Sequence, residues 1–126
     1  MLHDAHAFSG FSVNNLDTAQ KFYSDVLGVD AKLDEMGLHL TLGGGTEVFV
    51  YAKDDHVPAS FTILNFVVDD IDASVAGLIE KGVSFEKYEG MPQDDNGIAR
   101  GKAANMGPDI AWFKDPAGNI LSVLCN

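Results

Sequence analysis

The sequence is poor in cysteine and in basic residues. Its single cysteine, Cys125, cannot form an internal disulfide, and no cysteine pair is present for a zinc site. Only 8 lysines and arginines stand against 19 aspartates and glutamates, so the formal net charge is −11. That charge repels phosphate backbones and anionic bilayers, and we therefore expect no nucleic acid and no membrane among the partners.

Long apolar runs are also missing. No run approaches the ~18 residues of a membrane span, and residues 1–6 lack the basic and then apolar layout of a signal peptide. Together with the single cysteine, these features predict a cytoplasmic protein. What is present, 46% hydrophobic and 10% aromatic residues over 126 positions, suffices for a real core and excludes global disorder.

The first half of the chain predicts a strand, a helix and three further strands. Apolar residues recur at steps of three and four, which predicts a helix with Asp17 as N-cap and Gln20 three residues later. Gly28 is placed to end this helix in a left-handed turn. The predicted strands of this half lie at 7–13, 29–35, 38–42 and 46–52, and residues 54–59 form a predicted linker.

The same order returns in the second half. Its predicted elements are a strand over 61–68, a helix from Ile71 to Ile79, and strands over 83–88, 110–114 and 119–124. The acidic run at 69–72 is expected to cap the helix, where carboxylates meet its positive end. Residues 89–109 are rich in Gly, Pro, Asp and Asn and show no period, which is typical of a lid or a binding loop.

Two constant offsets relate the halves. Residues 11–17 match residues 66–72 at an offset of 55, and residues 45–51 match residues 118–124 at an offset of 73. The long loop of the second half accounts for the difference. An internal duplication is the simplest explanation, and the alternative is that two similar units arose from composition alone.

Two motifs carry a resemblance to a known family. The helix segment Lys21-Phe22-Tyr23 through Leu27-Gly28 and the turn Asp115-Pro116-Ala117-Gly118-Asn119 resemble the vicinal oxygen chelate superfamily, which includes glyoxalase I, extradiol dioxygenases and bleomycin-resistance proteins. The resemblance covers about residues 7–125. It implies an α+β fold with a single domain of two βαβββ modules, residues 7–53 and 61–125, whose sheets curl into a cup. It also implies a homodimer. Both motifs are expected to be scaffold rather than chemistry.

The resemblance also supplies a test for a metal site. Family enzymes hold a divalent metal with His, Glu or Gln from the first and fourth strands of each module. The matching positions here are Phe8, Phe49, Ile63 and Ser122, which obey the same two offsets. Three of these side chains have no donor atom and one hydroxyl is a poor lone ligand, so we expect no metal and no other cofactor. Glyoxalase activity, which needs a metal to polarise the substrate, is therefore not expected.

The four histidines offer no alternative metal site. His3 and His6 lie in the N-terminal tail, His39 in a short strand and His56 in the linker. No pair has the spacing of a metal motif, and we expect all four to be solvated surface groups.

The cup lining follows from the alternation of side chains along a strand. The predicted ligand-binding residues are Phe8, Ser12, Glu47, Phe49, Tyr51, Ile63, Asn65, Arg100, Trp112 and Ser122. Asn65 needs a hydrogen-bond partner in its apolar strand, which a ligand or water would supply. Alternatively, Phe8, Phe49 and Ile63 fill the cup as core.

Scarce positive charge gathers near the predicted cup. Arg100 and Lys102 lie in the long loop, and Trp112 and Lys114 lie on the next strand. This concentration would attract an anionic ligand, and the alternative is ordinary solvated loop charge.

The sequence therefore favours a metal-independent protein that binds a small organic molecule, aromatic or anionic, in the manner of the bleomycin-resistance branch. Two alternatives stay open: an enzyme of lyase, isomerase or dioxygenase type without a standard metal site, and a structural dimer whose cup is filled. Catalytic residues are not identified. Glu47, Tyr51 and Asp109 are the only acid–base candidates, and each would need a perturbed pKa. The expected partners are a small molecule and a second copy of the chain.

Overall fold

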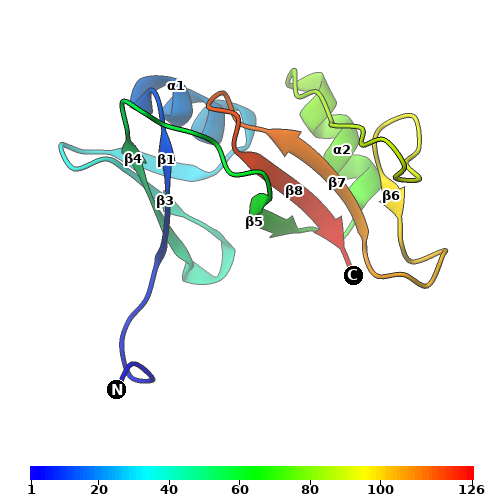
Figure 1. The fold of residues 1–126 in the computed structure, drawn as a ribbon, viewed down its shortest axis with the longest axis horizontal. Coiled ribbons are helices and arrows are strands. Elements are labelled where there is room, and N and C mark those ends of the chain that lie inside the picture. The colour runs from blue at the N-terminus through cyan, green and yellow to red at the C-terminus, as the bar shows by residue number, and fades with distance from the viewer. The chain divides into compact units, whose positions relative to one another are not determined.

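The computed structural model describes residues 1–126, which divide into two compact units, Met1–Val57 and Pro58–Asn126. In each unit a helix packs on one face of a four-stranded sheet (Figure 1). The fold is α+β with the strand–helix–strand–strand–strand order in both units, as predicted. The boundaries of a single domain over residues 7–125 stay a prediction.

The elements follow one another in the predicted order. The first unit contains β1 (Ser9–Val13), α1 (Leu16–Lys21), a π-helical turn (Phe22–Val26), β2 (Asp30–Leu33), β3 (Leu38–Thr41), a short 3-10 turn (Gly43–Gly45) and β4 (Glu47–Ala52). The second contains β5 (Thr62–Val67), α2 (Ile71–Glu80), β6 (Ala99–Arg100), β7 (Asp109–Lys114) and β8 (Ile120–Cys125). Neither helix has the length and hydropathy needed to cross a membrane.

The two sheets share one topology and one register. Their strand orders are β1-β4-β3-β2 and β5-β8-β7-β6, with the first and last strands of each unit parallel and the other neighbours antiparallel. Ser9 pairs with Val48, and Leu64 pairs with Leu121. Leu64 lies 55 residues after Ser9, and Leu121 lies 73 residues after Val48, so the strand pairing reproduces both offsets found in the sequence.

Each sheet buries one face under its helix; the opposite face is termed the open face, although Ser122 on that face of the second sheet is itself buried. On β4, Val48 and Val50 are buried, whereas Glu47 and Tyr51 are exposed and Phe49 is half-buried. This alternation is the period of two expected for a strand with one covered face. The buried residues of the first unit include Val13, Ala19, Tyr23, Leu38, Leu40, Val48 and Val50. Those of the second include Ile71, Val75, Ile98, Ala111, Phe113, Leu121 and Val123.

The start of α1 differs from the prediction. Asn15, not Asp17, is the N-cap, because its Oδ1 accepts a hydrogen bond of 2.9 Å from the backbone N–H of Thr18. Asn and Asp cap helices about equally well, so the residue types alone did not separate the two positions. Asp17 instead lies in the first helical turn, where a negative charge is also favourable.

The other predicted helix ends are confirmed. The helical stretch after α1 ends at Gly28, whose φ of 70° is the left-handed conformation expected there. At the start of α2, the carboxylate of Asp70 accepts a 3.1 Å hydrogen bond from the N–H of Ala73.

The strand predicted over 83–88 is wrong. Only Phe85 forms a bridge, to Phe113 of β7, and the N–H of Glu86 donates to the carbonyl of Trp112. The chain then leaves the sheet and returns as β6, whose Ala99 pairs with Ile110 further along β7. The edge of the second sheet is therefore shared by two segments, and part of the predicted irregular loop over 89–109 is strand.

The Asp115–Asn119 motif forms the turn between β7 and β8. Asp115 is buried, and its Oδ1 accepts hydrogen bonds of 2.9 Å from the N–H groups of Ala117 and Asn119. Its Oδ2 accepts a 3.0 Å hydrogen bond from the side-chain amide of Asn119. Gly118 has a φ of 85°, which glycine adopts without strain. These contacts stabilise the turn, so the motif has a structural role.

Candidate functional site

The four positions matched to metal ligands do not carry a donor set that fits a metal. Phe8 lies just before β1 and is 62% exposed, Phe49 lies on the open face of β4, and Ile63 lies at a β-bulge in β5. Ser122 on β8 is buried, and its hydroxyl donates a 2.5 Å hydrogen bond to Oδ1 of Asn65. In addition, no three His, Cys, Asp or Glu side chains are arranged to hold a metal ion.

The Asn65–Ser122 contact also identifies the partner that Asn65 needs. Asn65 and Ser122 are register neighbours on the parallel strands β5 and β8. Asn65 is exposed, so its amide is accessible while its oxygen satisfies the buried hydroxyl of Ser122. A ligand is therefore not required to explain the presence of Asn65 in this strand.

Aromatic rings cover the open face of the first sheet. The rings of His39 and Phe49 have centroids 5.2 Å apart, and the Phe49 and Tyr51 rings stack at 6.1 Å with an angle of 19°. A pocket of about 440 Å³ lies against these strands. It is lined by Phe8, Met36, His39, Leu40, Thr41, Glu47, Val48 and Phe49. Three predicted site residues, Phe8, Glu47 and Phe49, are thus brought together.

Two further polar contacts involve predicted site residues of the first unit. Glu47 lies 3.8 Å from His6, and Ser12 forms a 2.7 Å hydrogen bond with Nδ1 of His56. His56 is half-buried. The expectation that all four histidines are solvated surface groups is therefore wrong for His56, because the linker folds back onto β1.

A contact between Asp34 and His39 was missed by sequence reasoning. Oδ1 of Asp34 accepts hydrogen bonds from the N–H groups of Met36 (2.8 Å) and Gly37 (3.2 Å), which closes the turn between β2 and β3. Its Oδ2 lies 2.8 Å from Nε2 of His39. The hydrogen bond from Met36 is the largest cause that lowers the pKa of Asp34 below its ordinary 3.8, so this carboxylate is ionised at neutral pH. Buried Gly37 brings the backbone of the turn close to the Phe49 ring.

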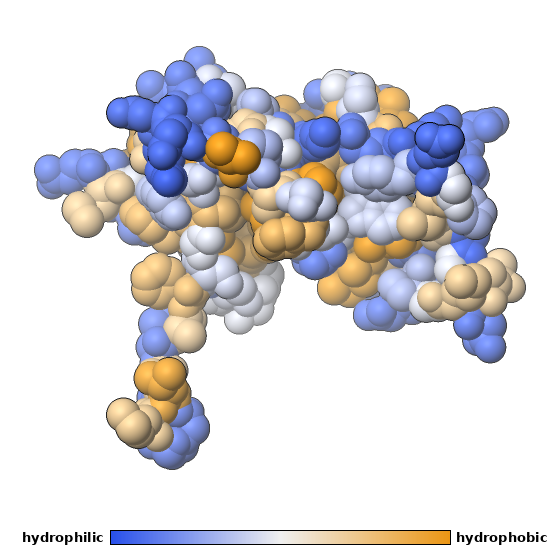
Figure 2. Space-filling view, in the orientation of Figure 1, coloured by the Kyte–Doolittle hydropathy of each residue, from blue (hydrophilic) through white to orange (hydrophobic).

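The second unit has a larger and mainly apolar pocket. Its volume is about 670 Å³, and its walls come from the loop before β6, from β6 itself, from the loop after it and from β7. The lining residues are Met91, Pro92, Gln93, Asp94, Ile98, Ala99, Arg100, Gly101, Ala104, Met106, Pro108, Ile110 and Trp112. Arg100 and Trp112 are the predicted site residues in this group. Figure 2 shows apolar surface on both units, bordered by hydrophilic residues.

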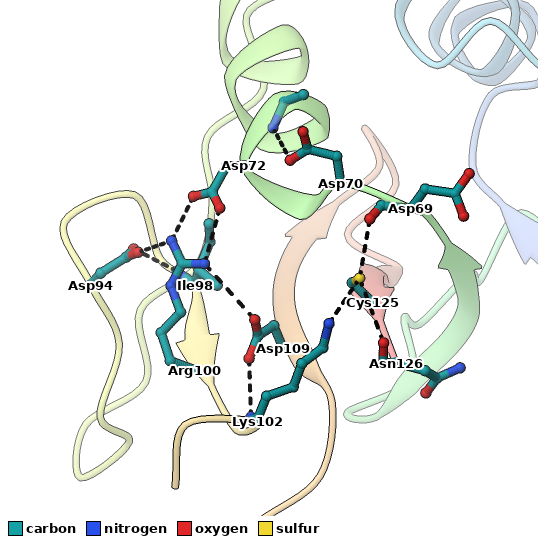
Figure 3. Close-up of polar contacts among 11 residues, drawn as sticks. Asp69, Asp70, Asp72, Asp94, Ile98, Arg100, Lys102, Asp109, Cys125 and Asn126 are labelled. Atoms are coloured by element: carbon teal, nitrogen blue, oxygen red, sulfur yellow. Dashed lines mark hydrogen bonds and ion pairs between the residues drawn. The ribbon is translucent and has the colours of Figure 1, made fainter. Parts of the chain in front are cut away.

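Arg100 is surrounded by carboxylates rather than open to an anionic ligand. Its guanidinium donates to Asp72 at 2.6 and 3.1 Å and to Asp94 at 3.0 Å, and it lies 3.9 Å from Asp109 (Figure 3). The hydrogen bond to Asp72 is the main reason that the pKa of Arg100 is raised, and the same bond lowers the pKa of Asp72. Burial alone would raise the pKa of Asp94, but hydrogen bonds from Ile98 and Arg100 outweigh it and lower that pKa.

The two nearby lysines also have partners. Lys102 Nζ lies 3.2 Å from the sulfur of Cys125, and Lys114 Nζ lies 3.5 Å from Glu86 (Figure 3 shows the first contact). Arg100 and Lys114 are therefore already paired with carboxylates within the unit, while Lys102 contacts a sulfur atom. The sequence did not reveal this, because Asp72 and Arg100 lie 28 residues apart.

Side chains fix the loop that walls the second pocket. The amide of Gln93 donates to the carbonyls of Glu86 (3.0 Å) and Gly97 (2.7 Å) and accepts from the N–H of Tyr88 (2.8 Å). Burial is the main cause that raises the pKa of Tyr88, whose ring packs edge-on against Trp112 at 5.5 Å. The loop thus has a defined conformation without a periodic sequence pattern. Its lining residues were missed because such a loop gives no period from which to assign a face.

Comparisons with known proteins agree with this architecture. The model of the Glyoxalase/Bleomycin resistance protein/Dioxygenase superfamily matches residues 5–123. TnmS3 of Streptomyces sp. CB03234, described as an antibiotic binding protein, has a similar structure, with a TM-score of 0.63, 24% identity and 97% of each chain covered. A glyoxalase family protein of Enterococcus faecalis is 22% identical over 98% of this chain and 99% of that chain, with a TM-score of 0.67.

A glyoxalase family protein of Bacillus anthracis is also similar, with a TM-score of 0.69 and 18% identity over 100% of this chain and 99% of that chain. At such identities, the structural likenesses show the shared fold. None of the curated proteins compared with the chain matches it.

Proposed function

We propose that this chain, which belongs to the Glyoxalase/Bleomycin resistance protein/Dioxygenase superfamily, binds a small, neutral and largely apolar organic molecule in the pocket of its second unit. The observation that carries the proposal is the pocket of about 670 Å³ with Trp112 in its wall. Small-molecule sites commonly have volumes of roughly 300–1,000 Å³, apolar walls and a few polar groups. Gln93 and Asp94 are polar residues in the lining, and both are held by hydrogen bonds within the unit.

The charge distribution favours a neutral ligand over an anionic one. Arg100 is the cation that lines the pocket, and it is paired with Asp72 and Asp94 at hydrogen-bond distance. An anion would have to displace these carboxylates or lie beside them, and like charges repel in such a site. We therefore still propose an aromatic ligand, but no longer an anionic one.

Apolar burial can supply the affinity without a metal. Burying ~200 Å² of apolar ligand surface at roughly 25 cal/mol per Å² contributes about 5 kcal/mol before the cost of association. The likeness to TnmS3, described as an antibiotic binding protein, supports binding as the activity. The side chains at the family's ligand positions support a metal-independent mode, since Phe8, Phe49 and Ile63 have no donor atoms.

We also propose that the protein acts as a homodimer. Large apolar side chains are exposed on both units, among them Val57 at 81%, Phe61 at 67% and Val67 at 66%. A second copy of the chain would remove such surface from water, which is favourable.

The binding proposal can be tested with N-phenyl-1-naphthylamine, a neutral fluorophore, on the full chain. Trp112 is the only tryptophan, so quenching of its emission reports occupancy of this pocket in the unaltered protein, and the fluorescence of the probe itself reports the affinity of every variant. We expect saturable binding that weakens about tenfold, or about 1.4 kcal/mol, in Trp112→Leu. The matched control Phe49→Leu removes an aromatic ring from the open face of the first sheet and should leave the affinity unchanged.

Three outcomes would contradict the proposal. The first is an absence of saturable binding, which would favour a filled, structural role. The second is a loss of affinity in Phe49→Leu but not in Trp112→Leu. The third is tighter binding of 8-anilino-1-naphthalenesulfonate, which carries the same ring system with a negative charge.

A further inference from the structure

Two of the four methionines of the chain line the pocket of the second unit. Met91 lies in the loop before β6 and Met106 in the loop after it, and both are part of the pocket wall. These residues are nevertheless 42% and 84% exposed, respectively. A residue that lines a cavity and is also open to solvent lies at the mouth of that cavity. Both thioethers are therefore accessible to a ligand and to a dissolved oxidant.

Hydrogen bonds fix the backbone that carries each methionine. The N–H of Met91 donates to the carbonyl of Tyr88 at 3.0 Å, and the N–H of Met106 donates to the carbonyl of Gly101 at 2.8 Å. Gly101 also packs closely within its loop, because a Cβ atom at this position would collide with the carbonyl oxygen of Pro108. The two loops thus hold the methionines at defined points of the pocket wall.

A methionine side chain suits an apolar ligand only while its sulfur is reduced. The thioether is flexible and polarizable, and it packs favourably against aromatic rings. A peroxide converts it into a sulfoxide, which is polar. An apolar ligand that covers the sulfoxide oxygen removes it from water without supplying a hydrogen bond, which is unfavourable. The amide of Gln93 and the guanidinium of Arg100, which also line the pocket, already donate to other groups.

We propose that Met91 and Met106 form an oxidative modification site through which peroxides lower the affinity of the pocket for apolar ligands. This inference rests on the function proposed for the second unit and adds its regulation. In the modification, the thioether sulfur gives an electron pair to hydrogen peroxide, the O–O bond breaks, an S–O bond forms, and the second oxygen leaves as water. Methionine sulfoxide reductases reverse the modification, so it acts as a switch rather than as permanent damage.

Oxidation with and without bound N-phenyl-1-naphthylamine tests whether a ligand covers both sulfurs. The full chain is treated with dilute hydrogen peroxide and then with dithiothreitol, which reduces Cys125 again, and the sulfoxide at each methionine is quantified by peptide mass spectrometry. We expect saturating probe to slow the oxidation of Met91 and Met106 by at least about threefold, because most of the protein is then in the bound state. Met36 lies in the first unit and is 74% exposed, so it is the internal control and should be oxidised at an unchanged rate.

The affinity of the oxidised protein for the same probe is the second measurement. We expect it to fall about tenfold, which corresponds to about 1.4 kcal/mol, and to recover after incubation with methionine sulfoxide reductases. In the double variant Met91→Leu/Met106→Leu, leucine keeps the wall apolar at a similar volume, so peroxide should leave the affinity unchanged. Met36→Leu is the matched control and should lose affinity on oxidation as the unaltered protein does.

An unchanged affinity after complete oxidation of Met91 and Met106 would overturn this inference and leave the proposed binding function intact. An equal loss of affinity in the oxidised double variant would do the same. Circular dichroism should show an intact fold after oxidation, and a loss of structure would mean that the affinity falls through unfolding instead. If the untreated protein does not bind the probe, both the proposed function and this inference are wrong.

Discussion

The two sheets have the same register but different open faces. Phe49 on β4 corresponds to Ser122 on β8, and its register neighbour Gly10 corresponds to Asn65. In the first unit a large ring lies beside a residue without a side chain, whereas in the second a small hydroxyl lies beside an amide. The pairs differ in chemistry but each combines one larger and one smaller residue. Burial under the helix constrains one face of each sheet, whereas the open faces carry different residue types, with a smaller residue beside each larger one.

The same comparison explains why the pockets differ. His39 on β3 and Trp112 on β7 are equivalent, since they pair with Phe49 and Ser122 respectively. In the first unit, a short turn of the hairpin supplies Asp34 to orient the histidine. In the second, a long loop walls a larger cavity against the tryptophan. The strand positions are equivalent, and the connecting segments determine what each position can do.

The largest expected effect is on the free energy of unfolding, and it tests whether equivalent core positions of the two sheets contribute equally to stability. Phe113 and Leu40 occupy the same repeat position and are both fully buried. Phe113→Ala should reduce the free energy of unfolding by about 3–5 kcal/mol and Leu40→Ala by about 2–5 kcal/mol, because each leaves a cavity. Urea denaturation followed by circular dichroism measures both.

Phe8→Ala is the control for these core variants. Phe8 is 62% exposed, so its truncation should change the free energy of unfolding by no more than about 0.5 kcal/mol. A core variant with an effect as small as that of Phe8→Ala would show that the equivalence of the two sheets is limited to their backbones.

A medium effect tests the compensation of volumes on the open faces. Ser122→Phe places a ring beside Asn65 and removes the hydroxyl that donates to it, which should cost about 1–3 kcal/mol. Adding Asn65→Gly recreates the Gly10–Phe49 combination of the first sheet and should restore part of that loss. We expect a favourable coupling of at least about 0.5 kcal/mol in the double-mutant cycle measured by urea denaturation.

Asn65→Gly alone provides the third corner of that cycle. It leaves the buried hydroxyl of Ser122 without its acceptor and should destabilise the protein by about 1–3 kcal/mol. Strictly additive effects of the two substitutions would mean that neighbouring open-face residues do not adapt to each other.

The smallest effect concerns acid stability. The pKa values of Asp72 and Asp94 are lowered from their ordinary 3.8, with Arg100 donating a hydrogen bond to each. Their contribution to stability is therefore present above that value and is lost as the pH falls through it toward the lowered folded-state values. Arg100→Met should make the melting temperature fall less steeply with pH in this window, while at neutral pH the change stays small because the ion pairs are partly exposed.

The first unit gives an internal reference for this titration. The pKa values of Asp34 and Asp55 are also lowered, the former mainly by the N–H of Met36 and the latter mainly by Lys53. These groups are untouched by Arg100→Met, so a residual pH dependence should remain. An identical slope for the variant and the unaltered protein, measured by calorimetry, would show that the Arg100 cluster does not contribute to acid stability.

Much of the fold could be predicted from the sequence because the strands and helices of the two halves have the same residue pattern. Residues that face the core must be apolar and recur with a fixed period, so equivalent strands of the two halves have similar sequences. The two offsets, found from the segments that begin at Phe11 and Gly45, therefore also relate the strand pairs of the first sheet to those of the second. The exchange of Asp17 for Asn15 as N-cap shows the limit of this approach, since two good capping residues lay within three positions.

The pockets were less predictable than the sheets. The loop around Gln93 is held by hydrogen bonds from side chain to backbone, which leave no periodic pattern. The partners of Arg100 were also hidden, because a long-range ion pair requires a known fold. His39 was interpreted as a solvated surface residue, although an aspartate five positions earlier can reach it across a hairpin turn. The ten predicted ligand-binding residues stay a prediction that the binding experiments test.

Gly37 restricts how sequences with this hairpin can change over evolutionary time. A Cβ atom at this position would lie 2.6 Å from the carbonyl oxygen of Val50 and 2.8 Å from Cζ of the Phe49 ring. A side chain here would therefore require a shift of the turn that carries Asp34, because loss of the Phe49 ring would leave the contact with the Val50 carbonyl unchanged. Glycine is thus the residue at position 37 that lets the β2–β3 turn lie against β4 without moving its backbone.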